Sequence, residues 1–198
     1  MDKKQETIDT YNNTAGQMAE KFNTIGARVA DIEMAFAHVS KTNPAVLEIG
    51  CGNGRDAKEI LKRTTNYLGL DISEGMVEIA KKYVPEGSFV VADIESYSFP
   101  KNLDIIFSFA SLLHSSKEHV QDVLDKAHEA LNEGGIFFIS LKCGEYREES
   151  RTDEFGTRTY YLYTPELIKE LAGNKYKVLY ENMHDLRDQK WLELILQK

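Results

Sequence analysis

The chain has 198 residues, which suits a single domain with one sizeable hydrophobic core, and no stretch of it has the composition of a linker or a repeat. Its formal net charge of −8 argues against a dedicated nucleic-acid-binding protein, because such proteins need a basic face that attracts phosphates. Its apolar runs are far shorter than the roughly 20 residues of a membrane-spanning helix, and no apolar signal region follows the charged start, so no membrane partner is expected.

Residues 19–39 carry apolar side chains at alternating spacings of four and three. This pattern predicts one amphipathic helix with a single buried stripe, made of Ile25, Val29, Ile32, Phe36 and Val39. Strand-like apolar runs follow near residues 45–49, 66–70, 88–92, 103–110 and 135–142, and helical patterns separate them. The alternation indicates an α/β fold in which helices cover both faces of a parallel sheet.

The C-terminal part of the chain departs from this alternation. Thr164 and Pro165 predict the start of a helix, with Thr164 as the capping residue and Pro165 at the first helical position. Two further strand-like runs cover residues 177–180 and 191–196. The connector between them is too short for a parallel crossover, so we expect an antiparallel hairpin.

Three glycines, Gly50, Gly52 and Gly54, directly follow the apolar run 46–49. Such a strand, tight turn and helix leave the backbone bare for a ligand to approach, which indicates a nucleotide-type site. Arg55 stands where a dinucleotide-binding loop has its third glycine, and the Gly-Lys-Ser/Thr of a phosphate-binding loop is absent from the sequence. Cys51 lies inside this loop, and only one other cysteine is present, so a reducing compartment, the cytoplasm, is expected.

Two acids end the next two apolar runs. Asp71 ends the run 67–70, and Asp93 follows the run 89–92. Because the carboxyl ends of parallel strands meet at one edge of a sheet, both carboxylates should lie near the glycines. A carboxylate at the tip of the second strand can accept both hydroxyls of a ribose, and one at the third can accept from an adenine amino group.

These stretches resemble the first three motifs of the class I S-adenosylmethionine-dependent methyltransferases: Leu47–Gly54, Gly69–Met76 and Val91–Ile94. The resemblance continues through Asp104–His114 and Leu131–Gly135 and covers nearly the whole chain. Within the family, the small-molecule methyltransferases of the tellurite-resistance and ubiquinone-biosynthesis types are the most similar. The resemblance implies one methyltransferase domain over residues 1–198, with S-adenosyl-L-methionine as the cofactor. It also implies a Rossmann-like, doubly wound sheet of seven mostly parallel strands with an antiparallel C-terminal hairpin.

The resemblance further implies which residues bind the cofactor. The backbone of the glycine loop would approach its methionine portion, with Glu48 supporting the loop, and Asp71 would bind the ribose. Tyr11, in a helical cap segment over residues 1–40, would lie near the cofactor's carboxylate. Ile72 and Met76 would flank the adenine, and Asp93 with the backbone of Ile94 would read its edge. The backbone at Phe109 or Ala110 would face the cofactor's amino group. The full set is Tyr11, Glu48, Gly50, Cys51, Gly52, Gly54, Asp71, Ile72, Met76, Asp93, Ile94, Phe109 and Ala110.

Methyl transfer from a sulfonium is a direct in-line displacement, so a general base is needed only if the acceptor must lose a proton. His114, just past the run 103–110, is the candidate base, and a structural hydrogen-bonding role is the alternative. Residues 143–163 are predicted to form a loop on the substrate side, in which Arg147 and Tyr160 are candidates for substrate binding. Acids interleave with the arginines there, so a solvated, self-neutralising loop is the alternative. Acids and histidines do not cluster at metal-ligand spacing, so no metal is predicted.

The resulting prediction is a methyltransferase that acts on a small-molecule acceptor, as a monomer or a homodimer. No Asn-Pro-Pro-Tyr or Pro-Cys element resembles those of base-modifying members of the family, so nucleic acid is not expected as a substrate. One alternative is a non-catalytic domain that binds the cofactor as a sensor or partner module. Another is an NAD-dependent oxidoreductase, which Arg55, Asp93 and the antiparallel C-terminal strands disfavour.

Overall fold

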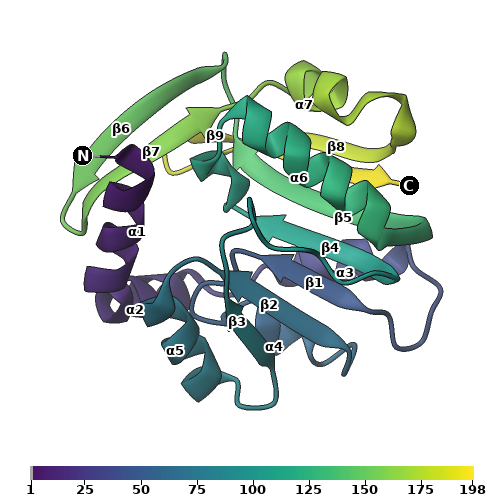
Figure 1. Cartoon of the computed structure of the whole chain (residues 1–198), viewed down its shortest axis with the longest axis horizontal. Coiled ribbons are helices and arrows are strands. Elements are labelled where there is room, and N and C mark those ends of the chain that lie inside the picture. Colours follow the sequence, from purple (N-terminus) through teal and green to yellow (C-terminus); the bar gives the residue numbers. More distant parts are fainter. Residues whose placement is uncertain (1) are drawn as a thin grey trace.

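A seven-stranded sheet with the order β3-β2-β1-β4-β5-β9-β8 organises the computed structural model, which describes residues 2–198 (Figure 1). Met1, with which the predicted domain and cap segment begin, lies outside the described residues. Each neighbouring pair from β3 to β5 is parallel. The strands are β1 (Val46–Ile49), β2 (Tyr67–Asp71), β3 (Ser88–Val91), β4 (Leu103–Phe109), β5 (Leu131–Lys142), β8 (Lys177–Leu186) and β9 (Gln189–Gln197).

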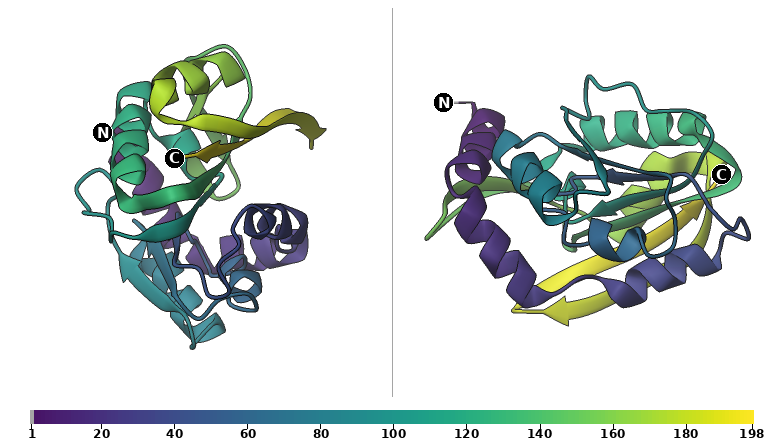
Figure 2. Two further views of the ribbon diagram at one scale, coloured as in Figure 1. Left: turned by 90° about the vertical axis from the view of Figure 1, so that its right-hand side faces the viewer. Right: turned by 90° about the horizontal axis from the view of Figure 1, so that it is seen from below.

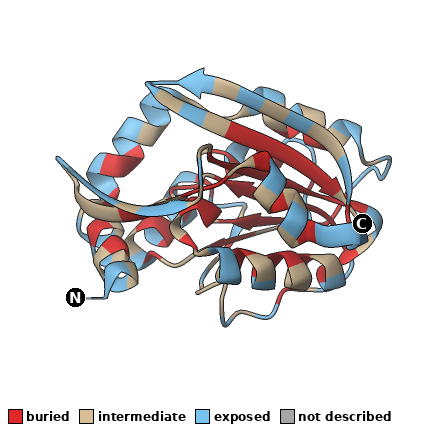
Figure 3. Cartoon of the chain, turned by 90° about the horizontal axis from the view of Figure 1, so that it is seen from above, coloured by how far each residue is buried: buried red, intermediate tan, exposed pale blue. Residues whose placement is uncertain are grey.

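Helices cover both faces of this sheet, as predicted (Figure 2). They are α1 (Lys3–Asn13), α2 (Ala15–Ile25), α3 (Val29–Ala37), α4 (Ala57–Ile60), α5 (Glu74–Tyr83), α6 (Lys117–Ala130) and α7 (Pro165–Ala172), with short 3-10 turns η1 (Leu112–His114) and η2 (Gly173–Lys175). Successive residues of a strand serve opposite faces: Leu47 belongs to the core with α6 and α7, whereas Val46 belongs to the core with α3, α4 and α5. The sheet is accordingly the most buried layer of the molecule (Figure 3).

The predicted antiparallel C-terminal hairpin is confirmed. β9 lies between β5 and β8 and runs antiparallel to both. Arg187 and Asp188 make the turn with φ values of 53° and 58°, the left-handed conformation that a two-residue hairpin turn needs. The helix predicted at Thr164 and Pro165 is also present, since the Thr164 hydroxyl accepts from the backbone N–H of Leu167 at 3.2 Å.

The helix predicted over residues 19–39 is two helices, so that prediction was wrong in its continuity. α2 ends at Ile25 and α3 begins at Val29. Gly26 has a φ of 82°, a conformation open to glycine that ends a helix, and its N–H bonds to the carbonyl of Phe22 at 3.2 Å. Ile25 and Val29, expected in the buried stripe, are therefore 41% and 45% exposed.

The segment 143–163, expected as a loop, contains a β-hairpin instead, with strands β6 (Arg147–Asp153) and β7 (Gly156–Leu162). α1 lies along β7 (Figure 1). The hydroxyl of Thr7 accepts from the N–H of Thr159 at 3.0 Å, and the hydroxyl of Thr10 donates to the carbonyl of Thr157 at 2.8 Å. The hairpin gains an ordered partner for one edge, which explains why this segment does not remain an irregular loop.

No helix within residues 2–198 combines the length and the apolar character that crossing a membrane would demand.

Candidate active site

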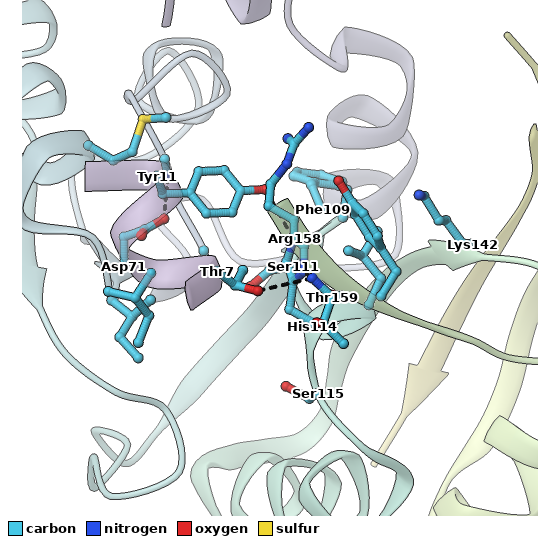
Figure 4. A pocket seen from close by; sticks show the side chains of 18 of the residues that line it. Thr7, Tyr11, Asp71, Phe109, Ser111, His114, Ser115, Lys142, Arg158 and Thr159 are labelled. Carbon is cyan, nitrogen blue, oxygen red and sulfur yellow. Dashed lines mark hydrogen bonds between the residues drawn. The ribbon is translucent and has the colours of Figure 1, made fainter. Parts of the chain in front are cut away.

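A cavity of about 1230 Å³ lies at the carboxyl ends of β1, β2, β4 and β5, and residues of α1 and of the β6–β7 hairpin also line it (Figure 4). The carboxyl edge of an open α/β sheet is where ligands bind. Pockets for one small molecule typically measure about 300 to 1000 Å³. This cavity is thus large enough for a nucleoside cofactor together with a second small molecule.

The glycine loop provides bare backbone to the cavity, as predicted for Gly50 and Gly52, which line it together with Cys51. Gly50 has a φ of 73°, and a Cβ there would come within 2.2 Å of the Ser111 hydroxyl oxygen. Gly52 has a φ of 52°, and a Cβ there would meet no atom within 4 Å. The close approach of Ser111 and the open space at Gly52 are the features that a backbone cradle for a ligand requires.

Gly54 and Glu48 have a different place from the other predicted cofactor residues, since neither lines the cavity. A Cβ on Gly54 would meet Ala80 of α5 at 3.3 Å, so this glycine permits close packing of the helix. The carboxyl group of Glu48 accepts from the hydroxyl of Tyr67 at 2.5 Å, and burial raises the pKa of Glu48 well above its usual range. Both residues therefore stabilise the loop without lining the cavity.

Asp71 lies at the end of β2 and lines the cavity. Its Oδ2 accepts from the backbone N–H of Gly52 and its Oδ1 from that of Ser73, both at 2.8 Å. Each carboxylate oxygen has two lone pairs, so one on each oxygen remains for a ligand. Burial raises the pKa of Asp71, and the backbone donors oppose that rise. The geometry suits the predicted role of binding two ribose hydroxyls.

Asp93, predicted to read the adenine edge, is paired with Lys4 of α1. The Nζ of Lys4 lies 2.7 Å from Asp93 Oδ2 and 2.7 Å from Glu95 Oε2. Partial burial acts to raise the pKa of Asp93, but the hydrogen bonds from Lys4 and from the N–H of Glu95 lower it overall. This ion pair holds the start of α1 beside Asp93. Lys4, Asp93 and Ile94 all line the cavity.

The remaining predicted apolar residues line the cavity as expected: Ile72, Met76, Phe109 and Ala110. Ala110 follows β4 with a φ of 55°, which is uncommon for a residue with a Cβ. Such strained backbone persists where surrounding structure enforces it, and it is concentrated at functional sites.

Tyr11 and His114 meet inside the cavity (Figure 4). The Nδ1 of His114 lies 2.6 Å from the carbonyl oxygen of Thr159, so Nδ1 carries a proton and donates it. Nε2 then accepts from the hydroxyl of Tyr11 at 3.0 Å. Burial lowers the pKa of His114 to about 4, so its imidazole is neutral at physiological pH. The predicted base therefore has its lone pair occupied by a tyrosine.

Arg28 is a cavity residue that was not predicted from the sequence. It follows the break at Gly26, and its backbone N–H bonds to Asp56 Oδ1 at 2.8 Å. Its guanidinium Nη1 lies 3.3 Å from Asp31 Oδ2, and its Cζ lies 5.4 Å from the ring centroid of Phe109. Gly26 is the signal that would have located it, since a glycine inside a helical pattern marks a break.

The two predicted substrate residues differ in their placement. Tyr160 lines the cavity, whereas Arg147 does not. The Arg147 side chain is 55% exposed and pairs with Glu149 on the hairpin. Lys142, the last residue of β5, lines the cavity and was not predicted. The sequence signal for Lys142 is the same as that for Asp71: a charged residue at the end of an apolar strand.

The described residues 2–198 contain no group of three or more His, Cys, Asp or Glu side chains arranged to hold a metal ion.

Fold and site together define an α/β protein whose sheet edge is built to bind a nucleoside cofactor. Residues 46–135 match the methyltransferase domain family. The malonyl-[acyl-carrier protein] O-methyltransferase 1 of Ilyobacter polytropus is 38% identical over 161 residues, 79% of this chain and 50% of that protein. The trans-aconitate 2-methyltransferase of Rhizobium etli is 29% identical over 97 residues, 48% of this chain and 37% of that protein. This chain thus spans half or less of these relatives' lengths.

A solved structure shares the fold. The 1,6-didemethyltoxoflavin-N1-methyltransferase of Burkholderia thailandensis, with bound 1,6-didemethyltoxoflavin and S-adenosylhomocysteine, aligns with a TM-score of 0.74 at 16% identity. The alignment covers 96% of this chain and 87% of that one. The chain thus contains a methyltransferase domain and has the fold of S-adenosylmethionine-dependent methyltransferases, enzymes whose cofactor is S-adenosyl-L-methionine.

Proposed function

We propose that this protein transfers a methyl group from S-adenosyl-L-methionine to a small-molecule acceptor by direct in-line displacement. One observation carries the proposal: a single cavity has Asp71 and the glycine loop at one end and Lys142 with Tyr160 at the other. Asp71 and Lys142 lie on opposite sides of the pocket, with Tyr11 and Phe109 between them (Figure 4). A cofactor and an acceptor can therefore be bound side by side, which is the arrangement that two-substrate transfer needs.

The bound cofactor supplies an electrophilic methyl carbon on a sulfonium. Asp71 binds the ribose hydroxyls, and the backbone at Gly52 makes room for the methionine portion. Arg28 lines the cavity and is a candidate to bind the cofactor's carboxylate. Held there, the cofactor would supply the methyl group, its sulfur would keep the electron pair of the broken carbon–sulfur bond, and the cavity residues would align the acceptor atom with the methyl carbon. Alignment of this kind contributes roughly 7 to 11 kcal/mol to catalysis.

His114 is proposed as a positioning residue for Tyr11 rather than as a general base. A base is most effective when its pKa is near the working pH, and burial lowers that of His114 to about 4. His114→Asn keeps a donor for the carbonyl of Thr159, and we expect turnover within about tenfold of wild type, whereas loss of a general base typically costs 100-fold or more. The measurement is kcat at saturating acceptor between pH 6 and 8. A loss of 100-fold or more that varies with pH would instead assign the base role.

A small molecule is proposed as the acceptor, and nucleic acid and membrane are not. The trans-aconitate and didemethyltoxoflavin enzymes act on small molecules by name, and the net charge of −8 opposes phosphate binding. Malonyl and trans-aconitate both contain carboxyl groups, which makes acids the first acceptors to test. We further propose one domain, a monomer or homodimer, in the cytoplasm. Cys51 and Cys143 are free, which supports a reducing compartment.

The test is equilibrium binding followed by turnover. We expect S-adenosylhomocysteine to bind with nanomolar to micromolar affinity in calorimetry and NAD to show no binding at the same concentrations. Release of S-adenosylhomocysteine with a panel of small acids, phenols and amines then separates an enzyme from a non-catalytic sensor. Binding of NAD alone would overturn the proposal in favour of an oxidoreductase. Cofactor binding without turnover on any acceptor would favour the sensor.

A further inference from the structure

Lys142 has an unusual environment for a lysine. It is the last residue of β5, is only 8% exposed, and lines the cavity next to the tip of β4. Within residues 2–198, no carboxylate lies within ion-pair distance of its Nζ, which instead lies 3.4 Å from the ring centroid of Tyr160. Burying an unpaired charge is costly, so proteins keep such groups paired or use them to bind a ligand.

The neighbouring charges are already matched. The hairpin faces Lys142 with two acids and two arginines, and ion pairs join Arg151 to Glu149 and Arg158 to Asp153. His114, which also packs against Tyr160 with ring centroids 4.9 Å apart, is neutral. Lys142 is therefore the one charge of this group that has no ion-pair partner.

The single unpaired positive charge of Lys142 indicates which class of ligand the site binds. A carboxylate carries one negative charge and accepts hydrogen bonds from an ammonium group, so it would neutralise the site. A phosphate carries nearly two charges, and the paired arginines leave the second uncompensated. A neutral acceptor would leave the buried ammonium without a partner. Tyr160 provides an aromatic face beside the ammonium group on which the carbon skeleton of an acid can pack.

We propose that Lys142 is the carboxylate-binding residue of the acceptor site and that the acceptor is a small carboxylic acid. This inference rests on the proposed function. Lys142 ends β5 and the glycine loop follows β1. One strand, β4, separates these two in the sheet, so a neighbouring-strand spacing of about 4.8 Å sets the two strands roughly 10 Å apart. An acid of a few carbon atoms held at Lys142 can reach the methyl group from there. Where the reacting atom is a carboxylate oxygen, the product is a methyl ester and no proton is transferred.

The experiment measures binding as well as turnover. Wild type, Lys142→Met and Lys142→Arg are saturated with S-adenosylhomocysteine and titrated with straight-chain monocarboxylic acids of three to six carbons, the matching amides, and inorganic phosphate. Lys58→Met is the matched control, because Lys58 also lies over a tyrosine ring, that of Tyr83 at 4.7 Å, but does not line the cavity.

We expect at least one monocarboxylate to bind wild type with an affinity about 10- to 100-fold above that of its amide and of phosphate. Lys142→Met should abolish this preference, Lys142→Arg should retain part of it, and Lys58→Met should leave it unchanged. Because burial lowers the pKa of Lys142 to about 8, the affinity should fall as the pH rises from 8 to 9, as the ammonium loses its proton. All variants should bind S-adenosylhomocysteine like wild type.

Four outcomes would overturn the inference. Amides could bind as well as the acids, phosphate could bind in preference to them, or Lys142→Met could leave the preference for acids intact. A turnover that rises with pH through 8 and is lost in Lys142→Arg would assign Lys142 as a general base instead. Each of these results leaves cofactor binding intact, whereas failure of S-adenosylhomocysteine to bind wild type would contradict the proposed function itself.

Discussion

Asp71→Ala is expected to weaken the binding of S-adenosylhomocysteine by about 100-fold or more. The carboxylate offers one free lone pair on each oxygen to the ribose, and hydrogen bonds to a charged group contribute about 1.5 to 3 kcal/mol each. The same oxygens accept from the N–H groups of Gly52 and Ser73, so the variant also loosens the glycine loop. Calorimetry on wild type and variant gives the change in Kd directly.

The 2′-deoxy analogue of S-adenosylhomocysteine separates these two effects. Wild type should bind the analogue about tenfold or more weakly than the parent compound, because one hydrogen bond to the carboxylate is lost. Asp71→Ala should bind both compounds equally, since it has no carboxylate to distinguish them. Equal affinity of wild type for the two compounds would contradict the assignment of Asp71 to the ribose, even if the alanine variant binds poorly.

Gly50→Ala is expected to lower the free energy of unfolding by about 2 to 5 kcal/mol and to remove cofactor binding. The new Cβ would lie 2.3 Å from Ser111 Cβ, and overpacking of this kind costs about 1 to 3 kcal/mol. The φ of 73° adds about 1 to 2 kcal/mol for a residue with a side chain. Urea denaturation with and without S-adenosylhomocysteine measures both effects.

Gly134→Ala is the matched control for backbone conformation alone. Gly134 has a φ of 77°, but a Cβ there would meet no atom within 4 Å, so only about 1 to 2 kcal/mol should be lost. Adding Ser111→Gly to Gly50→Ala removes the atoms that collide and should recover stability to about the level of Gly134→Ala. If Gly50→Ala alone is as stable as Gly134→Ala, the close contact with Ser111 is not what requires glycine at this position.

Much of the site could be predicted from single strands and their ends. Gly50, Gly52 and Asp71 follow apolar runs directly, and parallel strands bring their carboxyl ends to one edge, so their proximity follows from the strand pattern. The antiparallel C-terminal hairpin was predictable for a similar reason, because a short connector restricts the direction of the next strand. Lys142 carried the same signal as Asp71 and could have been found by it.

Contacts between distant segments were not predictable in this way. Tyr11 and His114, which are 103 positions apart, come into contact because α1 lies along β7. The same contact with α1 accompanies the β6–β7 hairpin in a segment expected as a loop. The pairing of Lys4 with Asp93 depends on the same placement of α1.

The sequence alone determined the order along the chain of the seven strands of the main sheet, the glycine loop and the acids at the strand tips, because apolar periodicity and turn chemistry are local properties. Only the tertiary structure decided which charged groups have partners. Arg147 is exposed and paired, Asp93 is joined to α1, and Lys142 is buried without a counter-charge. The strength of a charge depends on burial and on neighbours from other elements, and these exist only once the chain has folded.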